Sequence, residues 1–328
     1  MDRPGSTSGR PEFVVLTGPL GSGKTTLLSD HLAFADTSET GVLVNDAGAV
    51  NIDGAVIGSD HRNLALATLD GGCVCCSLGN DLQEGIDAVL LARAERGLGP
   101  PRRIILETSG LAEPAPIIRS LRMIRQVAFD VRIVATFDAS APHVGDSFLP
   151  HYASQLAAAQ TIVLTKLDRL AQPEWASHAA EARRFNPLAA LVAADQPRER
   201  ALAAFSADGD RPIARTSTFS ASAVPSSRIT VAFAEWRPAA PWDAILEWIE
   251  NLAGFFGNRL LRLKGLVRPA GHPDPLLING VGDAFSPPRR MQVKEDTNLG
   301  LMLILRDVTA AELSQPFSGE TGPMVRLH

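Results

Sequence analysis

The segment GPLGSGKTT, residues 18–26, constrains this chain more than any other feature. It fits the pattern G-x-x-x-x-G-K-[ST], in which glycines let consecutive backbone N–H groups turn towards phosphate oxygens. An apolar run at residues 13–17 precedes the segment and a helical pattern follows it, so bound phosphates would also meet the positive end of a helix. This context favours a phosphate-binding loop over a glycine-rich turn that fits by chance. The sequence therefore predicts a site for a nucleoside triphosphate.

Two side chains of the loop have expected roles in the chemistry. Lys24 can reach the β- and γ-phosphates, and the hydroxyl of Thr25 can bind Mg²⁺. The residues of the loop that we expect to bind the nucleotide are Gly18, Leu20, Gly21, Ser22, Gly23, Lys24, Thr25 and Thr26.

A carboxylate follows the next apolar run that reads as a buried parallel strand, residues 103–107. Glu107 ends this run and is placed to hold Mg²⁺ directly or through water. It opens the sequence ETSG, in which Gly110 is free to bend towards a γ-phosphate. We predict Lys24, Thr25 and Glu107 as catalytic residues, with Thr25 and Glu107 as the magnesium ligands.

Two further apolar runs, residues 132–138 and 161–165, are predicted strands, and the second ends in TKLD, residues 165–168. Guanine presents N1–H and an exocyclic amine as donors, and Asp168 can accept from both. Adenine presents a lone pair at N1, which a carboxylate rejects. Lys166 would cover the plane of the base with its aliphatic stem. The pattern favours GTP over ATP.

All three cysteines of the chain, Cys73, Cys75 and Cys76, lie within four residues. They come just before a predicted helix, whose N-terminus lowers the thiol pKa and favours the thiolate. Thiolates bind zinc, cobalt or copper(I). The alternatives that remain open are buried structural cysteines and a redox-active dithiol.

C-x-C-C supplies at most three metal ligands, so a tetrahedral site would need one more from elsewhere. The possible donors are Asp46, His61 and Asp70. The polar segment 46–70 has no clear secondary structure, and its Asp46, Asn51 and Asp53 face either a nucleotide and its metal or solvent.

The length of 328 residues suggests about two domains. Alternating strands and helices up to a last strand near 188–193 predict an α/β P-loop NTPase fold, a parallel sheet flanked by helices. Its ligands would bind at the carboxyl ends of the strands. A helix is expected from about residue 117. The predicted organisation is a disordered tail at 1–11, a nucleotide-binding domain with the cysteine motif at 12–206, a linker at 207–227 and a second domain at 228–328.

The second domain changes its pattern to a smaller α+β unit with an antiparallel sheet. Residues 229–233 alternate as a half-buried strand, and residues 243–256 form an amphipathic helix ended by Gly257. Further strands are expected near 259–267, 276–281, 290–294 and 299–305, followed by a short helix from 310. We find no catalytic pattern in this part.

Composition excludes several kinds of partner. A net charge of −5 gives no reason to expect nucleic acid or an anionic membrane. The chain contains no apolar run long enough for a membrane span and no visible signal peptide. We expect a cytoplasmic protein, where clustered cysteines indicate metal binding or redox chemistry rather than disulfides.

With GPLGSGKTT, GGCVCC, ETSGLAEPAP and TKLD in this order, the chain resembles the CobW-like family of P-loop GTPases. These are metal-handling relatives of the urease and hydrogenase nickel-insertion GTPases. The segments NRLLRLKGLV and LLINGV resemble the family's C-terminal domain, so the resemblance spans nearly the whole chain. It implies GTP hydrolysis coupled to transfer of zinc or cobalt, held by Cys73, Cys75 and Cys76, to a client metalloprotein.

Three features depart from the family pattern. Thr165 stands where the guanine motif usually has Asn, and Asp46 stands where Glu is frequent. The histidine-rich stretch of many members is missing, so we predict no metal-storage tail. We expect the nucleotide state to switch the loops around Asp46 and Glu107. The alternatives are a P-loop phosphotransferase and a nucleotide-regulated zinc-binding adaptor with negligible turnover.

Overall fold

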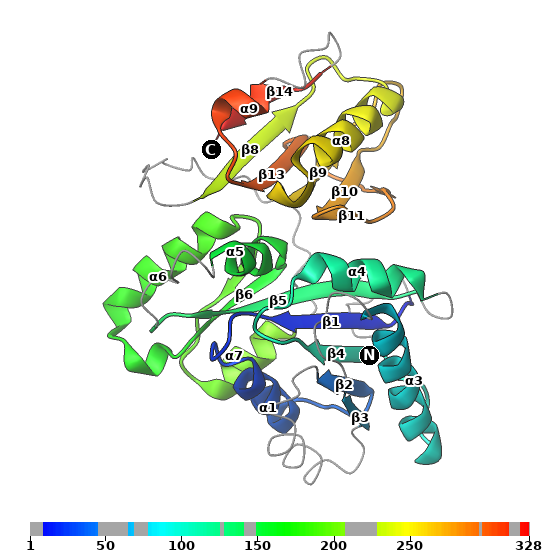
Figure 1. Cartoon of the computed structure of the whole chain (residues 1–328), viewed down its shortest axis with the longest axis vertical. Coiled ribbons are helices and arrows are strands. Elements are labelled where there is room, and N and C mark those ends of the chain that lie inside the picture. Colours follow the sequence, from blue (N-terminus) through cyan, green and yellow to red (C-terminus); the bar gives the residue numbers. More distant parts are fainter. Residues whose placement is uncertain are drawn as a thin grey trace. The chain divides into compact units, whose positions relative to one another are not determined.

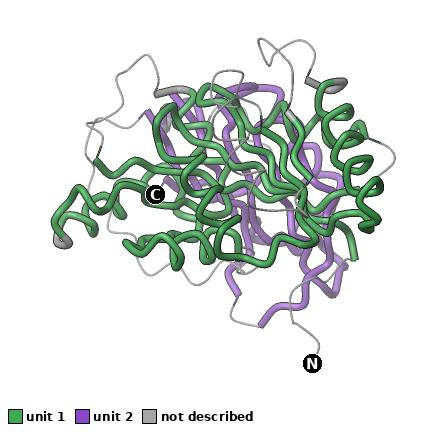
Figure 2. Tube along the Cα trace, turned by 90° about the horizontal axis from the view of Figure 1, so that it is seen from below, with its two compact units in different colours: residues 1–210 green, residues 211–328 purple. Residues whose placement is uncertain are grey.

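The structure is a computed structural model that describes residues 9–44, 65–68, 78–124, 128–140, 149–206, 228–294, 297–314 and 322–327. The chain divides into two compact units, Met1–Asp210 and Arg211–His328 (Figure 2). Each unit is built on a sheet of its own. None of the described helices is long and apolar enough to cross a membrane.

The first unit contains a parallel sheet in the order β3-β2-β4-β1-β5-β6-β7 (Figure 1). Its strands are β1 (Glu12–Thr17), β2 (Thr40–Val44), β3 (Ala65–Thr68), β4 (Arg103–Glu107), β5 (Asp130–Asp138), β6 (Thr161–Thr165) and β7 (Ala190–Val192). Since all of these strands run in one direction, their carboxyl ends meet at one edge of the sheet. The predicted α/β fold is confirmed.

Helices cover both faces of this sheet (Figure 1). They are α1 (Lys24–Phe34), α3 (Leu78–Glu95), α4 (Pro114–Met123), α5 (Leu149–Ala158), α6 (Gln172–Phe185) and α7 (Pro197–Ala204), with a 3₁₀ turn, η1 (Leu167–Arg169). Helices α1 and α7 pack on one face, and α3 to α6 follow one another along the other. Strands buried on both faces are apolar along their length, which is why the sequence reveals them.

Helix α4 and strand β3 differ most from expectation. Helix α4 begins at Pro114, three residues earlier than predicted, because proline suits the first helical position, where its missing N–H leaves nothing unsatisfied. Strand β3, four residues long, lies in the segment that had no clear assignment. Among the described strands it pairs with β2 alone, at the end of the sheet.

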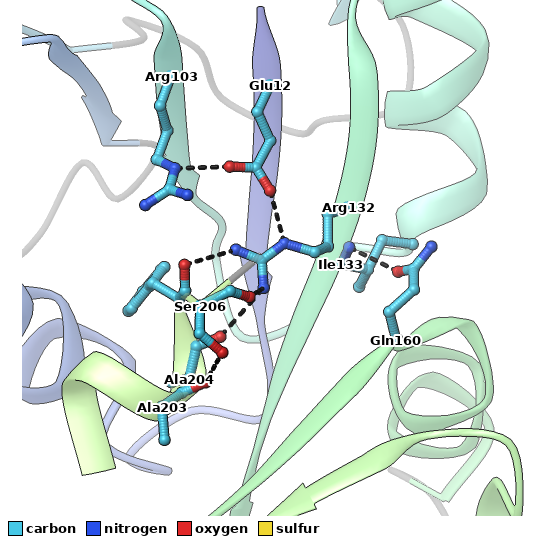
Figure 3. A network of polar contacts seen from close by, with 9 residues as sticks. Glu12, Arg103, Arg132, Ile133, Gln160, Ala203, Ala204 and Ser206 are labelled. Atoms are coloured by element: carbon cyan, nitrogen blue, oxygen red, sulfur yellow. Dashed lines mark hydrogen bonds and ion pairs between the residues drawn. The ribbon is translucent and has the colours of Figure 1, made fainter. Parts of the chain in front are cut away.

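Charged side chains join the amino ends of three strands to the end of α7 (Figure 3). Glu12 accepts from Arg103 at 2.6 Å and from Arg132 at 2.7 Å, which links β1, β4 and β5. The guanidinium of Arg132 also donates to the last carbonyls of α7 and beyond it, those of Ala204, Phe205 and Ser206, at 3.0–3.2 Å. The last carbonyls of a helix have no partner within the helix, so Arg132 closes that end with a charge of the favourable sign.

The second unit is an antiparallel sheet in the order β11-β10-β9-β13-β8-β14, with β12 paired to β10. Its elements are β8 (Ile229–Glu235), α8 (Trp242–Phe256), a 3₁₀ turn η3 (Gly257–Arg259), β9 (Leu260–Val267), β10 (Leu276–Val281), β11 (Ala284–Phe285), β12 (Arg289–Arg290), β13 (Gly300–Arg306), α9 (Ala310–Ser314) and β14 (Met324–Leu327). The α+β class is confirmed. Helix α8 packs its apolar side, including Ile245, Ile249 and Leu252, onto sheet residues such as Leu301 and Leu303.

The short strands of this unit are the ones that the sequence did not predict. The run at 290–294 contributes only to β12, Arg289–Arg290, and both β11 and β14 were unexpected. Strands of two to four residues carry too few alternations to show a period.

Candidate nucleotide site

The predicted phosphate loop connects the end of β1 to the start of α1 at the carboxyl edge of the sheet. Its three glycines are required by geometry, and Gly21 is one of them because its φ of 73° lies in the left-handed region. Gly18 packs against Thr136 of β5 so closely that a Cβ would collide with the Thr136 hydroxyl. Gly23 precedes α1 with φ 88°, in the left-handed region that favours glycine. The loop thus delivers its N–H groups to the N-terminus of α1, where anions bind.

Lys24 lies folded over this loop. Its Nζ atom donates to the carbonyl oxygens of Gly18 at 2.9 Å and Pro19 at 3.0 Å, and the side chain is 7% exposed. The ammonium is therefore held against the backbone of the loop, and in P-loop proteins the lysine at this position contacts the β- and γ-phosphates.

The other predicted loop residues take different positions. The Ser22 hydroxyl is buried, 2.6 Å from that of Thr136 and 2.7 Å from the carbonyl of Pro19, so it maintains the loop instead of facing a ligand. Leu20 has its side chain 83% exposed, and Thr26 is exposed on the first turn of α1. Leu20 and Ser22 can therefore reach a phosphate only through their backbone.

The Thr25 hydroxyl donates to Oε1 of Glu107 at 2.5 Å. Glu107 is the last residue of β4, which pairs with β1, and only 3% of it is exposed. The contact places a hydroxyl and a carboxylate oxygen beside Lys24 at the start of α1. Oxygen donors of these two kinds are the ligands that Mg²⁺ prefers. The residues present fit the predicted cation.

The ETSG turn after β4 is packed against the phosphate loop. A Cβ on Gly110 would lie 2.5 Å from the backbone nitrogen of Leu20, so the approach requires glycine. The side-chain amide of Gln155, from α5, donates to the carbonyls of Gly110 at 3.0 Å and Ala112 at 3.1 Å. Gln155 could not be predicted from the sequence, because a single glutamine on an apolar helix carries no signal of a contact across the fold.

The predicted base-binding residues follow β6. The Thr165 hydroxyl shares its hydrogen between the carbonyl oxygens of Ser22, at 2.8 Å, and Phe137, at 3.2 Å. The next residue, Lys166, contacts Asp138 at the end of β5. Asp168 is exposed within η1, where its carboxylate is open to a ligand. The structure thus brings the phosphate loop and TKLD together through Thr165, in the position where the family pattern usually has Asn.

The predicted transition-metal ligands Cys73, Cys75 and Cys76 lie outside the described residues. So do the residues considered as a fourth ligand or as nucleotide contacts, Asp46, Asn51, Asp53, His61 and Asp70. Among the side chains that the structure does describe, no cluster of three or more His, Cys, Asp or Glu can hold a metal ion. The cysteine site stays a prediction.

The nucleotide-binding domain that defines the CobW/HypB/UreG proteins matches residues 12–193, more than half of the chain. The chain belongs to the CobW/HypB/UreG family. The cobalamin synthesis protein cobW C-terminal domain matches residues 229–319, so both units are those of a CobW-type protein. The predicted resemblance is confirmed.

Two proteins that the chain resembles are named zinc chaperones. The chain is 28% identical over 279 residues to "Zinc chaperone YjiA" of Escherichia coli, covering 83% of this chain and 86% of that protein. It is 37% identical over 161 residues to "Zinc chaperone YeiR" of the same organism, covering 47% and 46%. A crystal structure of Zn(II)-bound YjiA GTPase from Escherichia coli superimposes with a TM-score of 0.71 at 21% identity, covering 93% of this chain and 96% of that chain. The last match establishes the shared fold.

Proposed function

We propose that this CobW-type chain binds and hydrolyses GTP and couples the nucleotide cycle to holding a transition metal and releasing it to a client metalloprotein. The observation that carries the proposal is the contact of Thr25 with Glu107, 2.5 Å between the two oxygens, beside the phosphate loop. The family's nucleotide-binding domain across 12–193 supports it. Since YjiA and YeiR are both named zinc chaperones, we propose zinc before cobalt.

Hydrolysis rests on three side chains of this chain. Lys24 would exchange its two carbonyl partners for phosphate oxygens and keep its charge opposite the γ-phosphoryl group that is transferred to water, with GDP as the leaving group. Thr25 and Glu107 would hold Mg²⁺, which neutralises charge on the phosphate oxygens when it is bound. The N–H groups at the start of α1 add a fixed positive potential. We assign Lys24, Thr25 and Glu107 as catalytic residues on this basis.

Base selection rests on the turn after β6. Asp168 would accept from the two guanine donors, and the stem of Lys166 would lie over the ring. Displacement of labelled GTP from the protein by unlabelled GTP or ATP tests this assignment. Asp168→Asn should weaken GTP binding but tolerate xanthosine triphosphate, whose C2 carbonyl can accept from the new amide. Equal displacement by ATP and GTP in the unaltered protein would remove the guanine assignment.

Hydrolysis itself is tested with Lys24→Ala. We expect loss of GTP turnover, because the variant removes the cation opposite the developing charge. Lys294→Ala, at an exposed lysine of the second unit, is the matched control and should turn over GTP like the unaltered protein. A substrate scan with candidate phosphoryl acceptors separates hydrolysis from transfer. Turnover unchanged in Lys24→Ala would contradict the assignment of the loop.

The metal step is tested by titrating zinc and cobalt in the presence of GDP or a slowly hydrolysed GTP analogue. Linkage requires that metal and nucleotide change each other's affinity by one factor, typically about 1–3 kcal/mol in coupling free energy. Cobalt reports thiolate ligation through its charge-transfer bands, which the double variant Cys75→Ser, Cys76→Ser should lose. Binding should weaken at low pH, as thiols must deprotonate. Equal metal affinity in both nucleotide states would contradict the coupling.

A further inference from the structure

An ion pair joins the ends of two neighbouring strands at the carboxyl edge of the first sheet. Asp138 is the last residue of β5, and Thr165, the last residue of β6, lies opposite it in the register. The residue after Thr165 is Lys166, whose Nζ lies 2.5 Å from Oδ2 of Asp138. The side chains are 13% and 26% exposed for Asp138 and Lys166, so the pair is largely withdrawn from solvent.

Both carboxylate oxygens of Asp138 are engaged. Oδ2 accepts from Lys166, while Oδ1 accepts from the backbone N–H of Ser140 at 3.0 Å and from its hydroxyl at 2.8 Å. Burial alone would raise the pKa of Asp138, but the hydrogen bonds from Lys166 and Ser140 outweigh it and leave the pKa below its ordinary value. The carboxylate is therefore ionised at neutral pH and fixed in orientation.

The backbone of Lys166 is held in an uncommon conformation. Its φ is 57°, in the left-handed region that a residue with a side chain rarely adopts. This turn directly follows β6 and starts η1, which carries Asp168. Since the ammonium is fixed by Asp138 and the backbone by the turn, the stem of Lys166 between them has little freedom.

The same turn is tied to the phosphate loop. The Thr165 hydroxyl reaches the carbonyl of Ser22 at 2.8 Å, and the N–H of Ala139 donates to the carbonyl of Thr165 at 3.2 Å. The turn after β6 is thus held from the phosphate loop on one side and from the end of β5 on the other. Among the hydrogen bonds and ion pairs of the described residues, the contact with Asp138 is the only one that joins Lys166 to a charged side chain.

We propose that Asp138 is a positioning residue for base recognition, which acts by fixing Lys166 over the nucleotide base and by holding the turn that presents Asp168. The inference rests on the proposed function, in which Lys166 and Asp168 bind the base. If the ion pair served stability alone, its loss would not weaken binding of the base while leaving binding of the phosphates unchanged. That difference is measurable.

The test compares GDP with inorganic tripolyphosphate, which uses the phosphate loop but has no base. Asp138→Asn keeps the shape of the side chain and can still accept from Ser140, but it removes the charge that holds Lys166. We expect the dissociation constant for GDP to rise about tenfold, equivalent to about 1.4 kcal/mol. The dissociation constant for tripolyphosphate should stay within about twofold. Calorimetry measures both dissociation constants, and so does the fluorescence of a labelled GDP when tripolyphosphate is added as the competitor.

A double-mutant cycle asks whether Asp138 acts through Lys166. Lys166→Met keeps an aliphatic stem and removes the ammonium. If Asp138 acts through the ammonium, Asp138→Asn should add little to the loss of GDP affinity already caused by Lys166→Met. Additive losses, or equal losses for GDP and tripolyphosphate, would overturn the proposal. So would unaltered GDP binding in Asp138→Asn.

Two further variants control for folding. Asp30→Asn removes the carboxylate of another partly buried ion pair of this unit, with Arg200 at 3.7 Å, and should leave both ligands unaffected. Ser140→Ala removes only the hydroxyl bond to Asp138 and should give a smaller GDP-selective loss, which keeps the proposal testable if Asp138→Asn fails to fold. The cycle is repeated with ADP. Equal affinity of the unaltered protein for ADP and GDP would remove the guanine assignment, while the cycle would still decide the role of Asp138.

Discussion

Thr25 and Glu107 meet beside the phosphate loop, the hydroxyl of one donating to the carboxylate of the other at 2.5 Å across 82 residues of chain. The contact joins the first turn of α1 to the end of β4. Because Glu107 is buried, its charge is oriented by the fold before any ligand arrives. Preorganised charge of this kind costs no rearrangement at the moment of reaction.

Glu107→Gln should therefore lower the rate constant of GTP hydrolysis by about a hundredfold or more. The amide keeps the size of the side chain and removes the charge that would hold Mg²⁺. We expect GDP affinity without magnesium to change little, and the magnesium concentration for half-maximal turnover to rise. Glu39→Gln, at an exposed ion pair with Arg102, is the control and should behave like the unaltered protein. Normal turnover in Glu107→Gln would exclude the carboxylate from catalysis.

Gln155→Leu should loosen the ETSG turn. The change removes the two donors that hold the carbonyls of Gly110 and Ala112, which should cost about 1–3 kcal/mol of unfolding free energy. It should also lower the rate constant of GTP hydrolysis, since Gly110 lies against the phosphate loop.

A buried glutamine at the opposite edge of the same sheet provides the control. Gln160 accepts from the N–H of Ile133 at 2.7 Å, away from the predicted site (Figure 3). Gln160→Leu should cost similar stability and leave the hydrolysis rate constant unchanged. Urea unfolding and single-turnover hydrolysis measure the two effects. Parallel losses of activity in both variants would mean that stability, and not the turn, limits turnover.

His31 should make stability depend on pH. It stacks on Phe205 with ring centroids 4.2 Å apart, and burial, aided by the charges of Arg103 and Arg132, lowers its pKa to about 4. An unfolded histidine has a pKa of about 6.5, so between these two values the unfolded chain takes up a proton that the folded one refuses. The unfolding free energy should be unaffected above about pH 6.5 and fall as pH drops towards 4, by up to about 3 kcal/mol.

Urea titrations at several pH values between 4 and 7 measure this slope. His31→Leu removes the titrating group and keeps an apolar side chain between α1 and α7. The variant should lose this part of the pH dependence. An identical slope in the variant and the unaltered protein would assign the pH dependence to other groups.

Arg132→Met should destabilise the first unit by about 3 kcal/mol. The change leaves the half-buried Glu12 with one partner fewer and the last carbonyls of α7 without their donors. Arg102→Met is the matched control, because Arg102 is 81% exposed in its ion pair with Glu39. The control should change the unfolding free energy by less than about 0.5 kcal/mol. Equal unfolding free energies for the two variants would contradict the role assigned to Arg132.

The sequence predicted the parts of this fold that repeat a simple pattern. The buried strands around the phosphate loop are continuous apolar runs, and Lys24, Thr25 and Glu107 stand at positions that a known spacing defines. The contacts of Gln155 and Asp138 could not be predicted in this way. Each joins segments that are distant in sequence or on different strands, and neither residue type has a spacing that marks such a contact.

Thr165 shows a different limit of sequence reasoning. Compared with the family pattern it is a departure, which loosens the case for strict selectivity for GTP. In the fold its hydroxyl supports the phosphate loop through Ser22, a role that depends on how closely β6 approaches the loop. Pattern comparison scores the residue type, whereas the backbone geometry decides what a side chain of that size can reach.

The closure of α7 by Arg132 has a consequence for how such proteins can be assembled. The last carbonyls of a helix at the end of a unit normally accept hydrogen bonds from the segment that follows. Here Ala204, Phe205 and Ser206 take theirs from Arg132, a side chain of the same unit. Among the described residues, these three carbonyls therefore have their donor within the first unit. A boundary built in this way lets the segment that follows be lengthened, shortened or exchanged for another without unravelling the helix before it.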